Sequence, residues 1–180
     1  MDLFLFLALT AVVFLSSLIG TGAILPVLGA RGILDHPNER SSHSMPTPKG
    51  GGIVVIACIA VAWGMMATAA PQAGIILAVI AAALALALLS WLDDLKGLNP
   101  LGRLLGQVAA VAFVLFSPLS DPFFAAPYFG GLLPGALDGL AAGLLCLWFI
   151  NLFNFMDGID GISGVEAVAI GGGLCLVALV

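Results

Sequence analysis

Three short segments hold most of the charged residues of this chain, and we call residues 35–49, 91–103 and 151–160 the first, second and third polar islands. Six of the ten acidic residues lie in them: Asp35, Glu39, Asp93, Asp94, Asp157 and Asp160. Clustered carboxylates repel one another, which favours binding of a hard divalent cation such as Mg²⁺, with Mn²⁺ as the alternative. Mg²⁺ takes one or two protein carboxylates and keeps positions for phosphate oxygens. The acids therefore predict metal-assisted chemistry on a substrate that carries phosphate.

The second island contains an adjacent pair of acids, Asp93 and Asp94, directly after the apolar run 73–92. Acidic residues at membrane depth are rare and usually mark functional sites. The alternative is that acids only solvate the end of a helix, and for any single acid that alternative carries at least equal weight. For a vicinal pair we favour a functional role.

The third island places amide and carboxylate side chains at intervals of three residues. Its members are Asn151, Asn154, Asp157 and Asp160. On a continuous helix each step of three residues turns the side chain by about 60°, so the first and the last would face opposite sides. The glycines at 158 and 161 would let the helix break and both carboxylates face one cavity. The alternative is a plain Asp-Gly turn, and the two asparagines favour the site.

The first island cannot form a regular helix, because it contains prolines at positions 37, 46 and 48. It leads into three glycines, residues 50–52. Backbone amides at a glycine-rich helix start can bind an anion, and Arg40, His43 and Lys49 add donors and positive charge. A nucleotide diphosphate suits this mixture. Glycines also serve as hinges, however, and a single histidine is more often a surface residue than a ligand.

The elements that carry these islands belong to a membrane protein. Hydrophobic residues make up 62% of the chain and charged residues 8%, whereas soluble domains are about one quarter charged. A helix needs ~20 apolar residues to cross ~30 Å of hydrocarbon. Stretches of that length, or nearly so, are 3–30, 52–70, 73–92, 104–119, 132–150 and 162–180. We predict an all-α, polytopic transmembrane bundle of six helices in one integral-membrane domain, residues 1–180.

The five basic residues predict the topology. Arg31, Arg40 and Lys49 accompany the loop after the first helix, and Lys96 and Arg103 the loop after the third. The positive-inside rule places both loops in the cytoplasm and the N-terminus outside. The helix count then places the third island on the cytoplasmic side as well. The predicted cytoplasmic loops are 31–51, 92–104 and 151–162, all at one face, as a single composite site requires.

Together these motifs resemble the polyprenyl-phosphate N-acetylhexosamine-1-phosphate transferases, a family that includes phospho-N-acetylmuramoyl-pentapeptide transferase and undecaprenyl-phosphate GlcNAc-1-phosphate transferase. Residues 35–43, followed by Pro48 and the glycines at 51–52, resemble the family's first cytoplasmic signature. Residues 91–94 resemble its Asp-Asp motif, and residues 151–161 its Asn-x-x-Asn-x-x-Asp-Gly-x-Asp-Gly signature. The residues of the first and third motifs resemble the branch that initiates O-antigen synthesis more closely than the peptidoglycan branch.

The resemblance implies a Mg²⁺-dependent phosphotransferase of the bacterial inner membrane with a cytoplasmic active site. It would transfer N-acetylhexosamine 1-phosphate from a UDP-sugar to undecaprenyl phosphate or another polyprenyl phosphate, with release of UMP, as the initiating step of cell-envelope polysaccharide synthesis. Its partners would be these two substrates and the lipid bilayer, without nucleic acid. Both direct attack and an aspartyl-phosphate intermediate remain open, as does the oligomeric state, a homodimer included.

The same resemblance implies roles for individual residues. Asp93 and Asp94 are the catalytic candidates, with Asp93 deprotonating or orienting the lipid phosphate. Asp94 and Asp157 are the candidate metal ligands. The candidate substrate-binding residues are Asn38, Arg40, His43, Lys49, Asn151, Asn154, Asp157 and Asp160.

The resemblance spans the whole chain but only about the N-terminal half of a family member. We therefore expect a truncated chain, whose activity requires further helices, another metal-binding aspartate and a histidine-rich cytoplasmic loop. The alternative function is an ion- or proton-coupled transporter, which also places Asp and Asn residues beside broken helices. The acids cluster at one face instead of near the midplane, which counts against that alternative.

Overall fold

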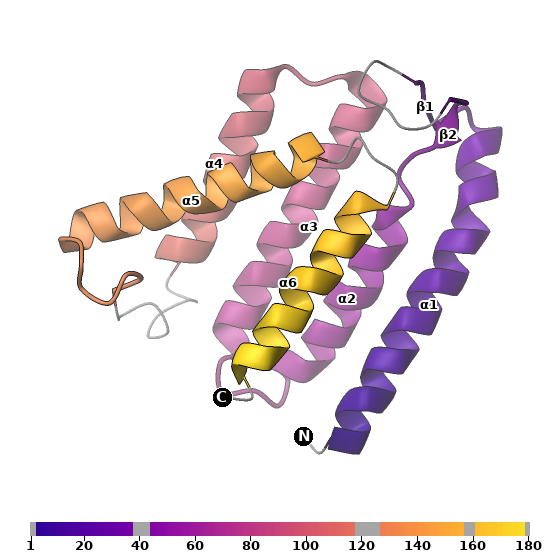
Figure 1. Ribbon diagram of the computed structural model, residues 1–180. Coiled ribbons are helices and arrows are strands. Elements are labelled where there is room, and N and C mark those ends of the chain that lie inside the picture. Colours follow the sequence, from indigo (N-terminus) through magenta and orange to yellow (C-terminus); the bar gives the residue numbers. More distant parts are fainter. Residues whose placement is uncertain (1–2, 38–43, 118–126, 157–160, 179–180) are drawn as a thin grey trace.

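The computed structural model describes residues 3–37, 44–117, 127–156 and 161–178. Within them the chain forms six helices and one two-stranded ribbon (Figure 1). The helices are α1 (Leu3–Ala30), α2 (Gly52–Ala67), α3 (Ala73–Lys96), α4 (Pro100–Phe116), α5 (Gly135–Met156) and α6 (Ile162–Ala178). The ribbon pairs β1 (Leu34–Asp35) antiparallel with β2 (Thr47–Pro48). The all-α prediction is confirmed.

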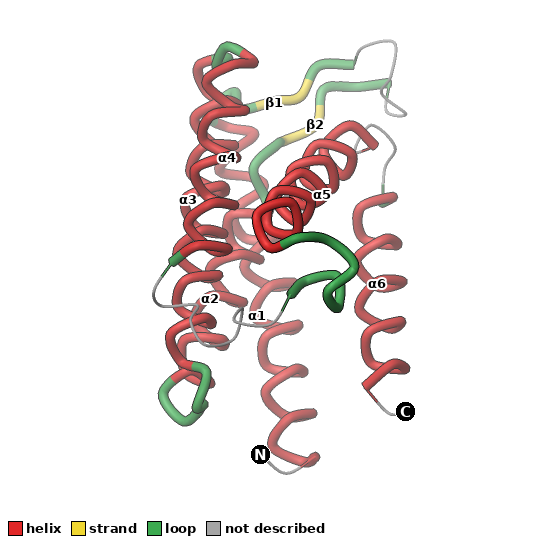
Figure 2. Tube along the Cα trace, turned by 90° about the vertical axis from the view of Figure 1, so that its left-hand side faces the viewer, coloured by secondary structure: helices red, strands yellow, loops and turns green. Residues whose placement is uncertain are grey.

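The first four helices form a row in which each helix packs against the next one in the chain. Helix α5 packs against α4 and lies across the row, while the main neighbour of α6 is α5 (Figure 1). Seen from the side, α6 stands apart from the row (Figure 2). Because α1 and α3 end, and α4 begins, at the same end of the row as the ribbon, the first two islands share that end.

Small residues fill the interior between the helices. The buried hydrophobic residues of the described chain are Leu28, Ala62, Ala67, Ala78, Ala82, Ala110 and Ala142. Glycine brings helices closer still, since a Cβ at Gly106 of α4 would lie 2.6 Å from Leu89 of α3. Membrane helices pack in this way because lipid tails are as apolar as leucine, which leaves close van der Waals contact to hold the helices together.

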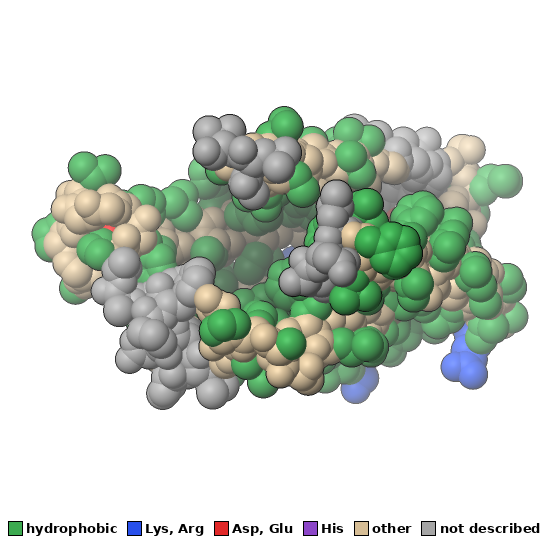
Figure 3. All heavy atoms as spheres, turned by 90° about the horizontal axis from the view of Figure 1, so that it is seen from below, with side chains coloured by type: hydrophobic (Ala, Val, Ile, Leu, Met, Phe, Trp, Pro, Cys, Tyr) green, Lys and Arg blue, Asp and Glu red, His purple; other side chains and the backbone are tan. Residues whose placement is uncertain are grey.

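The large hydrophobic side chains point outward. Phe4, Leu88, Trp148 and Phe155, for example, are exposed, and hydrophobic side chains cover much of the end opposite the ribbon (Figure 3). Helices α1, α3 and α5 are long and apolar enough to cross a membrane. Helices α2, α4 and α6 are apolar but shorter, with 16 or 17 residues, and reach about 24–26 Å at 1.5 Å per residue. The fold is that of a membrane protein.

The connection between α3 and α4 is shorter than the predicted loop 92–104. Helix α3 continues through both aspartates to Lys96, and α4 already begins at Pro100. Gly97 ends α3 in the left-handed conformation with φ +64°, its N–H donating to the Asp93 carbonyl. Asn99 then caps α4 by accepting from the Gly102 N–H, with proline at the first helical position. Hydropathy alone places these helix ends at residues 92 and 104 and does not predict the capping residues.

The third island is also more helical than the predicted loop 151–162. Helix α5 continues to Met156, because neither asparagine interrupts its hydrogen bonding, and α6 begins at Ile162. Gly161 has φ +83°, which glycine adopts without strain. Gly158, the other glycine at which a break was predicted, lies among residues 157–160, which are outside the described chain.

The opposite end of the row contains one buried acid that the sequence analysis passed over. Asp138, in the first turn of α5, is only 3% exposed. Its carboxylate accepts hydrogen bonds from the backbone N–H groups of Tyr128 (2.7 Å) and Phe129 (3.1 Å). The Tyr128 hydroxyl donates to the Leu115 carbonyl (3.2 Å), and burial, with a further contribution from the nearby Asp138 carboxylate, raises the pKa of Tyr128. Asp138 thus ties the α4–α5 connection to α5.

Candidate functional site

The two adjacent aspartates point in different directions. Asp93 Oδ2 forms an ion pair with Arg103 Nη1 at 2.8 Å, and Asp93 Oδ1 accepts from the Leu98 N–H at 2.8 Å. Asp94 Oδ1 instead lies 3.5 Å from Lys49 Nζ. Consecutive residues of a helix are turned by about 100°, and both aspartates are helical because α3 extends to Lys96. One acid therefore faces α4 and the other faces the ribbon.

Asp93 connects the end of α3 to the start of α4. Its carboxylate contacts the connecting turn at Leu98 and the first turns of α4 at Arg103. The Arg103 side chain is 41% exposed, and its guanidinium has further donors for another anion. Arg103 was predicted to indicate topology only and was not predicted as a site residue. The available signal was its spacing of four residues from Gln107, which puts both polar side chains on one face of α4.

A pocket of about 370 Å³ lies where α3, α4 and α5 meet, and we call it the polar pocket because half of its lining residues are polar. Its polar lining residues are Ser90 and Asp93 from α3, Arg103 and Gln107 from α4, and Asn151 and Asn154 from α5. The Asn151 side-chain amide donates to Gln107 Oε1 at 2.8 Å and to the Leu147 carbonyl at 2.8 Å, which holds α5 against α4. The second island, through Asp93 and Arg103, and the third island, through Asn151 and Asn154, thus line the same pocket.

The first island approaches α3 from the other side. The ribbon pairs Leu34 with Pro48 and Asp35 with Thr47, and the Lys49 N–H donates to the Ile33 carbonyl at 3.2 Å. Because of this pairing, the Lys49 ammonium lies beside the Asp94 carboxylate. Three further predicted binding residues, Asn38, Arg40 and His43, lie outside the described chain, as do Asp157 and Asp160 of the third island.

The glycines before α2 are packed against side chains. A Cβ at Gly50 would overlap the indole ring of Trp91, and a Cβ at Gly51 would lie 3.3 Å from Thr21 and 3.5 Å from Leu25. Gly50 also has φ +97°, a backbone conformation that favours glycine. Close packing and backbone conformation therefore explain two of the three glycines that the sequence analysis considered for anion binding.

The described residues of the polar pocket do not by themselves form a metal cage. Among the residues that the structure describes, no group of three or more His, Cys, Asp or Glu side chains could hold a metal ion. Asp93 and the amide oxygens of the pocket are oxygen donors, and Mg²⁺ needs only one or two carboxylates when phosphate oxygens complete its shell. Asp94 lies on the Lys49 side of α3, and its predicted co-ligand Asp157 is outside the described chain.

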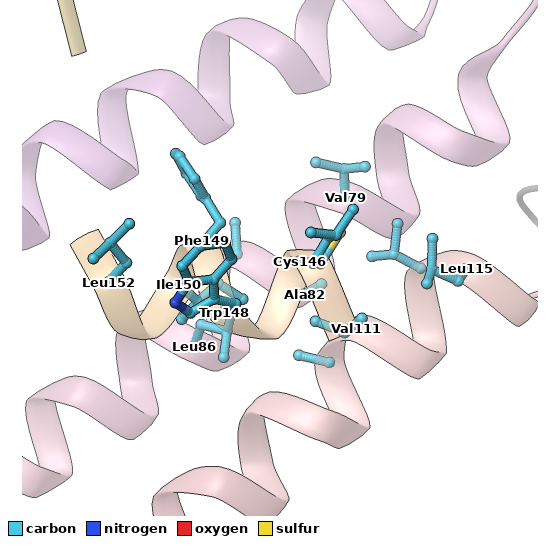
Figure 4. A pocket seen from close by; sticks show the side chains of 14 residues that line it. Val79, Ala82, Leu86, Val111, Leu115, Cys146, Trp148, Phe149, Ile150 and Leu152 are labelled. Atoms are coloured by element: carbon cyan, nitrogen blue, oxygen red, sulfur yellow. The ribbon is translucent and has the colours of Figure 1, made fainter. Parts of the chain in front are cut away.

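An apolar groove of about 630 Å³ adjoins the polar pocket. It runs between α3, α4 and α5 and is lined by side chains such as Val79, Val111, Leu115, Cys146 and Phe149 (Figure 4). Residues 83, 86 and 150 line both the groove and the pocket, so the two spaces are contiguous. An amphiphilic molecule could place its apolar part in the groove and its polar part in the pocket.

These features define a polytopic membrane protein with a polar pocket at one end of its helices and an apolar groove leading to it. The sequence profile of glycosyl transferase family 4 matches residues 75–180, which include every lining residue of the groove and all those of the pocket except Ile56. The chain belongs to this family. The membership confirms the resemblance to the polyprenyl-phosphate N-acetylhexosamine-1-phosphate transferases.

One curated relative is a decaprenyl-phosphate N-acetylglucosaminephosphotransferase from Mycolicibacterium smegmatis. It is 29% identical over 155 residues, an alignment that covers 79% of this chain and 36% of the relative. The chain thus spans about a third of the relative's length. No solved structure matches the chain.

Proposed function

We propose that the chain forms part of an enzyme that transfers a sugar 1-phosphate from a UDP-N-acetylhexosamine to a polyprenyl phosphate and releases UMP. The observation that carries this proposal is the contiguity of the polar pocket and the apolar groove. A polyprenyl phosphate has the same two parts, a long apolar chain and an anionic head. Family membership gives no support to the transporter alternative.

In the proposed reaction an oxygen of the lipid phosphate attacks the β-phosphorus of the UDP-sugar. A new phosphorus–oxygen bond forms, and the bond from the β-phosphorus to the bridging oxygen breaks, so that UMP departs with the electron pair. Phosphoryl transfer depends mainly on positioning and on neutralising charge. The cations of Arg103 and Lys49 lie on the two sides of the α3 terminus, where they could bind phosphate oxygens of the two substrates.

The proposed roles of the acids follow from their partners. Asp93, which lines the pocket beside Arg103, orients the lipid phosphate through that guanidinium. Asp94 and Asp157 contribute to binding Mg²⁺, which when bound would neutralise charge on the diphosphate. Asn151 and Asn154 line the pocket and offer amide groups to the nucleotide-sugar. The remaining predicted binding residues, Asn38, Arg40, His43, Lys49 and Asp160, are proposed to contact the donor.

The acceptor chain would lie in the groove between α3, α4 and α5. Its lining residues are apolar, so an isoprenoid can stay at bilayer depth while its phosphate reaches the pocket. The relative from Mycolicibacterium smegmatis is named as a decaprenyl-phosphate N-acetylglucosaminephosphotransferase. We therefore propose UDP-N-acetylglucosamine as the first donor to test, and a bacterial polyprenyl phosphate, undecaprenyl or decaprenyl, as the acceptor.

We further propose that the enzyme lies in the bacterial inner membrane with its polar pocket on the cytoplasmic side, and that it begins the synthesis of a cell-envelope polysaccharide such as O-antigen. UDP-sugars are cytoplasmic, and the described cations Arg31, Lys49, Lys96 and Arg103 lie at the pocket end of the helix row. A cysteine substituted for Ser44, just outside the ribbon, should react with an impermeant maleimide only from the cytoplasmic side. Reaction from outside would reverse the proposed orientation.

The test of the activity is transfer of radiolabel from a panel of UDP-N-acetylhexosamines to undecaprenyl and decaprenyl phosphate. Membranes containing the full-length protein are compared with membranes containing this 180-residue chain, with Mg²⁺, with Mn²⁺ and with a chelator. We expect metal-dependent labelled lipid and an equal amount of UMP from the full-length protein. Asp93→Asn should abolish the product, while Arg31→Gln, which removes an exposed charge after α1, should not. Absence of product with every donor would refute the proposal.

A further inference from the structure

The indole of Trp91 lies directly against the backbone of Gly50, the residue that joins the ribbon to α2. An added Cβ at Gly50 would lie 3.2 Å from both Cε3 and Cη2 of Trp91 and closer still to Cζ3. Only a residue without a side chain permits this contact, and the φ of +97° at the same position also favours glycine. The face of α3 that carries Trp91 is therefore fitted to Gly50, the residue that directly follows the first island.

The same face of α3 also contacts the last residue of the first island, Lys49. Asp94 follows Trp91 by three residues, which places both on one side of the helix. Lys49, whose ammonium lies 3.5 Å from Asp94, directly precedes Gly50. Lys49 and Gly50, which follow β2 and which we call the ribbon end, thus contact α3 at two adjacent points, one ionic and one apolar.

The ionic contact alone is too weak to set this arrangement. The side chains of Lys49 and Asp94 are 31% and 37% exposed, and ion pairs of this kind contribute little because water screens them. The lysine side chain is also long and flexible, so many backbone positions would let it reach the acid. A rigid indole against a glycine backbone permits far fewer positions.

We propose that Trp91 is a positioning residue for the donor diphosphate, because its indole fixes the ribbon end on α3 and so holds the Lys49 ammonium beside Asp94. This inference rests on the proposed function for the identity of the ligand. It assigns to Trp91 a role through Lys49, with no contact between the indole and the substrate. The free ammonium donors of Lys49 then meet phosphate oxygens in a geometry that the side chain alone would not maintain.

The first experiment needs no substrate. Amide hydrogen exchange of the full-length protein in detergent is compared for the wild type, Trp91→Ala and Trp91→Phe, with Trp63→Ala as the matched control, since Trp63 is 46% exposed on α2. We expect Trp91→Ala to speed exchange in peptides that contain the Lys49 amide, which donates to Ile33. Trp91→Phe and Trp63→Ala should leave those peptides unchanged. Unchanged exchange in Trp91→Ala would overturn the inference, whatever reaction the protein catalyses.

The second experiment measures the transfer reaction with the same variants. We expect Trp91→Ala to raise KM for the UDP-sugar about tenfold or more, because misplacement of a positioned group by ~1 Å can cost up to ~100-fold. KM for the polyprenyl phosphate should stay unchanged, and Trp91→Phe should restore the KM for the donor. Loss of folded protein would instead lower kcat and leave both KM values unchanged. That outcome, or an equal rise in both KM values, would contradict the positioning role.

The two experiments separate the inference from the proposed function. Faster exchange near Lys49 in Trp91→Ala, without transfer by the wild type from any donor, would refute the proposed reaction and leave the packing role of Trp91 intact. Transfer by the wild type with unchanged exchange and unchanged donor KM in Trp91→Ala would refute the inference alone.

Discussion

Removal of the Arg103 guanidinium should destabilise the protein through its ion pair with Asp93. The two atoms lie 2.8 Å apart, and the side chains of Arg103 and Asp93 are 41% and 22% exposed. Fully exposed pairs contribute ~0.2–1 kcal/mol and hydrogen bonds to charged groups ~1.5–3 kcal/mol. Because this pair is partly exposed and partly screened, we expect a coupling of about 1–2 kcal/mol.

The assay is a double-mutant cycle on the full-length protein, followed by equilibrium unfolding in mixed detergent micelles. It compares the wild type, Arg103→Met, Asp93→Asn and the double variant. The weaker pair of Lys49 and Asp94, 3.5 Å apart, provides an internal comparison, for which we expect at most about 0.5 kcal/mol. Arg31→Met controls for the loss of one positive charge at the same end of the helix row.

Two results would refute this reasoning. Additive effects of Arg103→Met and Asp93→Asn would show that the ion pair makes no net contribution to the free energy of unfolding. A coupling for Lys49 and Asp94 as large as that for Arg103 and Asp93 would show that distance and exposure do not decide the contribution. We also expect the larger coupling to fall as salt rises, because the arginine is accessible to counterions.

Three further outcomes follow from the structure. Asp138→Ala should lower the free energy of unfolding by about 2–4 kcal/mol, because two backbone N–H groups lose their acceptor; an effect below that of an average surface substitution would contradict the anchoring role. Gly97→Ala should lower the free energy of unfolding by about 1–2 kcal/mol, because φ is +64° there, whereas Gly52→Ala at the first residue of α2 should leave it unchanged. Both positions have open space for a Cβ, so an equal loss at both would show that backbone conformation is not the cause. Polyprenyl phosphate should slow the reaction of Cys146 in the groove with N-ethylmaleimide in a saturable way and leave Cys175 on α6 unaffected; equal slowing of both thiols would speak against binding in the groove.

The sequence predicted the helices well because the signals that form them are local. Long apolar runs, prolines and glycines mark helices and breaks regardless of what surrounds them. The predicted starts at residues 3, 52, 73 and 162 coincide with the observed starts of α1, α2, α3 and α6. The largest errors lie at polar helix ends, where hydropathy falls before the helix stops. The continuation of α3 to Lys96 and of α5 to Met156 are the two clearest cases.

The sequence by itself determined that the polar residues form islands at the ends of apolar helices, because charged groups cannot remain unpaired in hydrocarbon. Only the tertiary structure decided which of these side chains meet. Asp93 and Asp94 look equivalent in the chain, but the extension of α3 turns one toward Arg103 and the other toward Lys49. The contact of Trp91 with Gly50 likewise joins residues forty-one positions apart. Such contacts depend on how helices are rotated and placed against one another, which distant packing sets and local residue patterns do not specify.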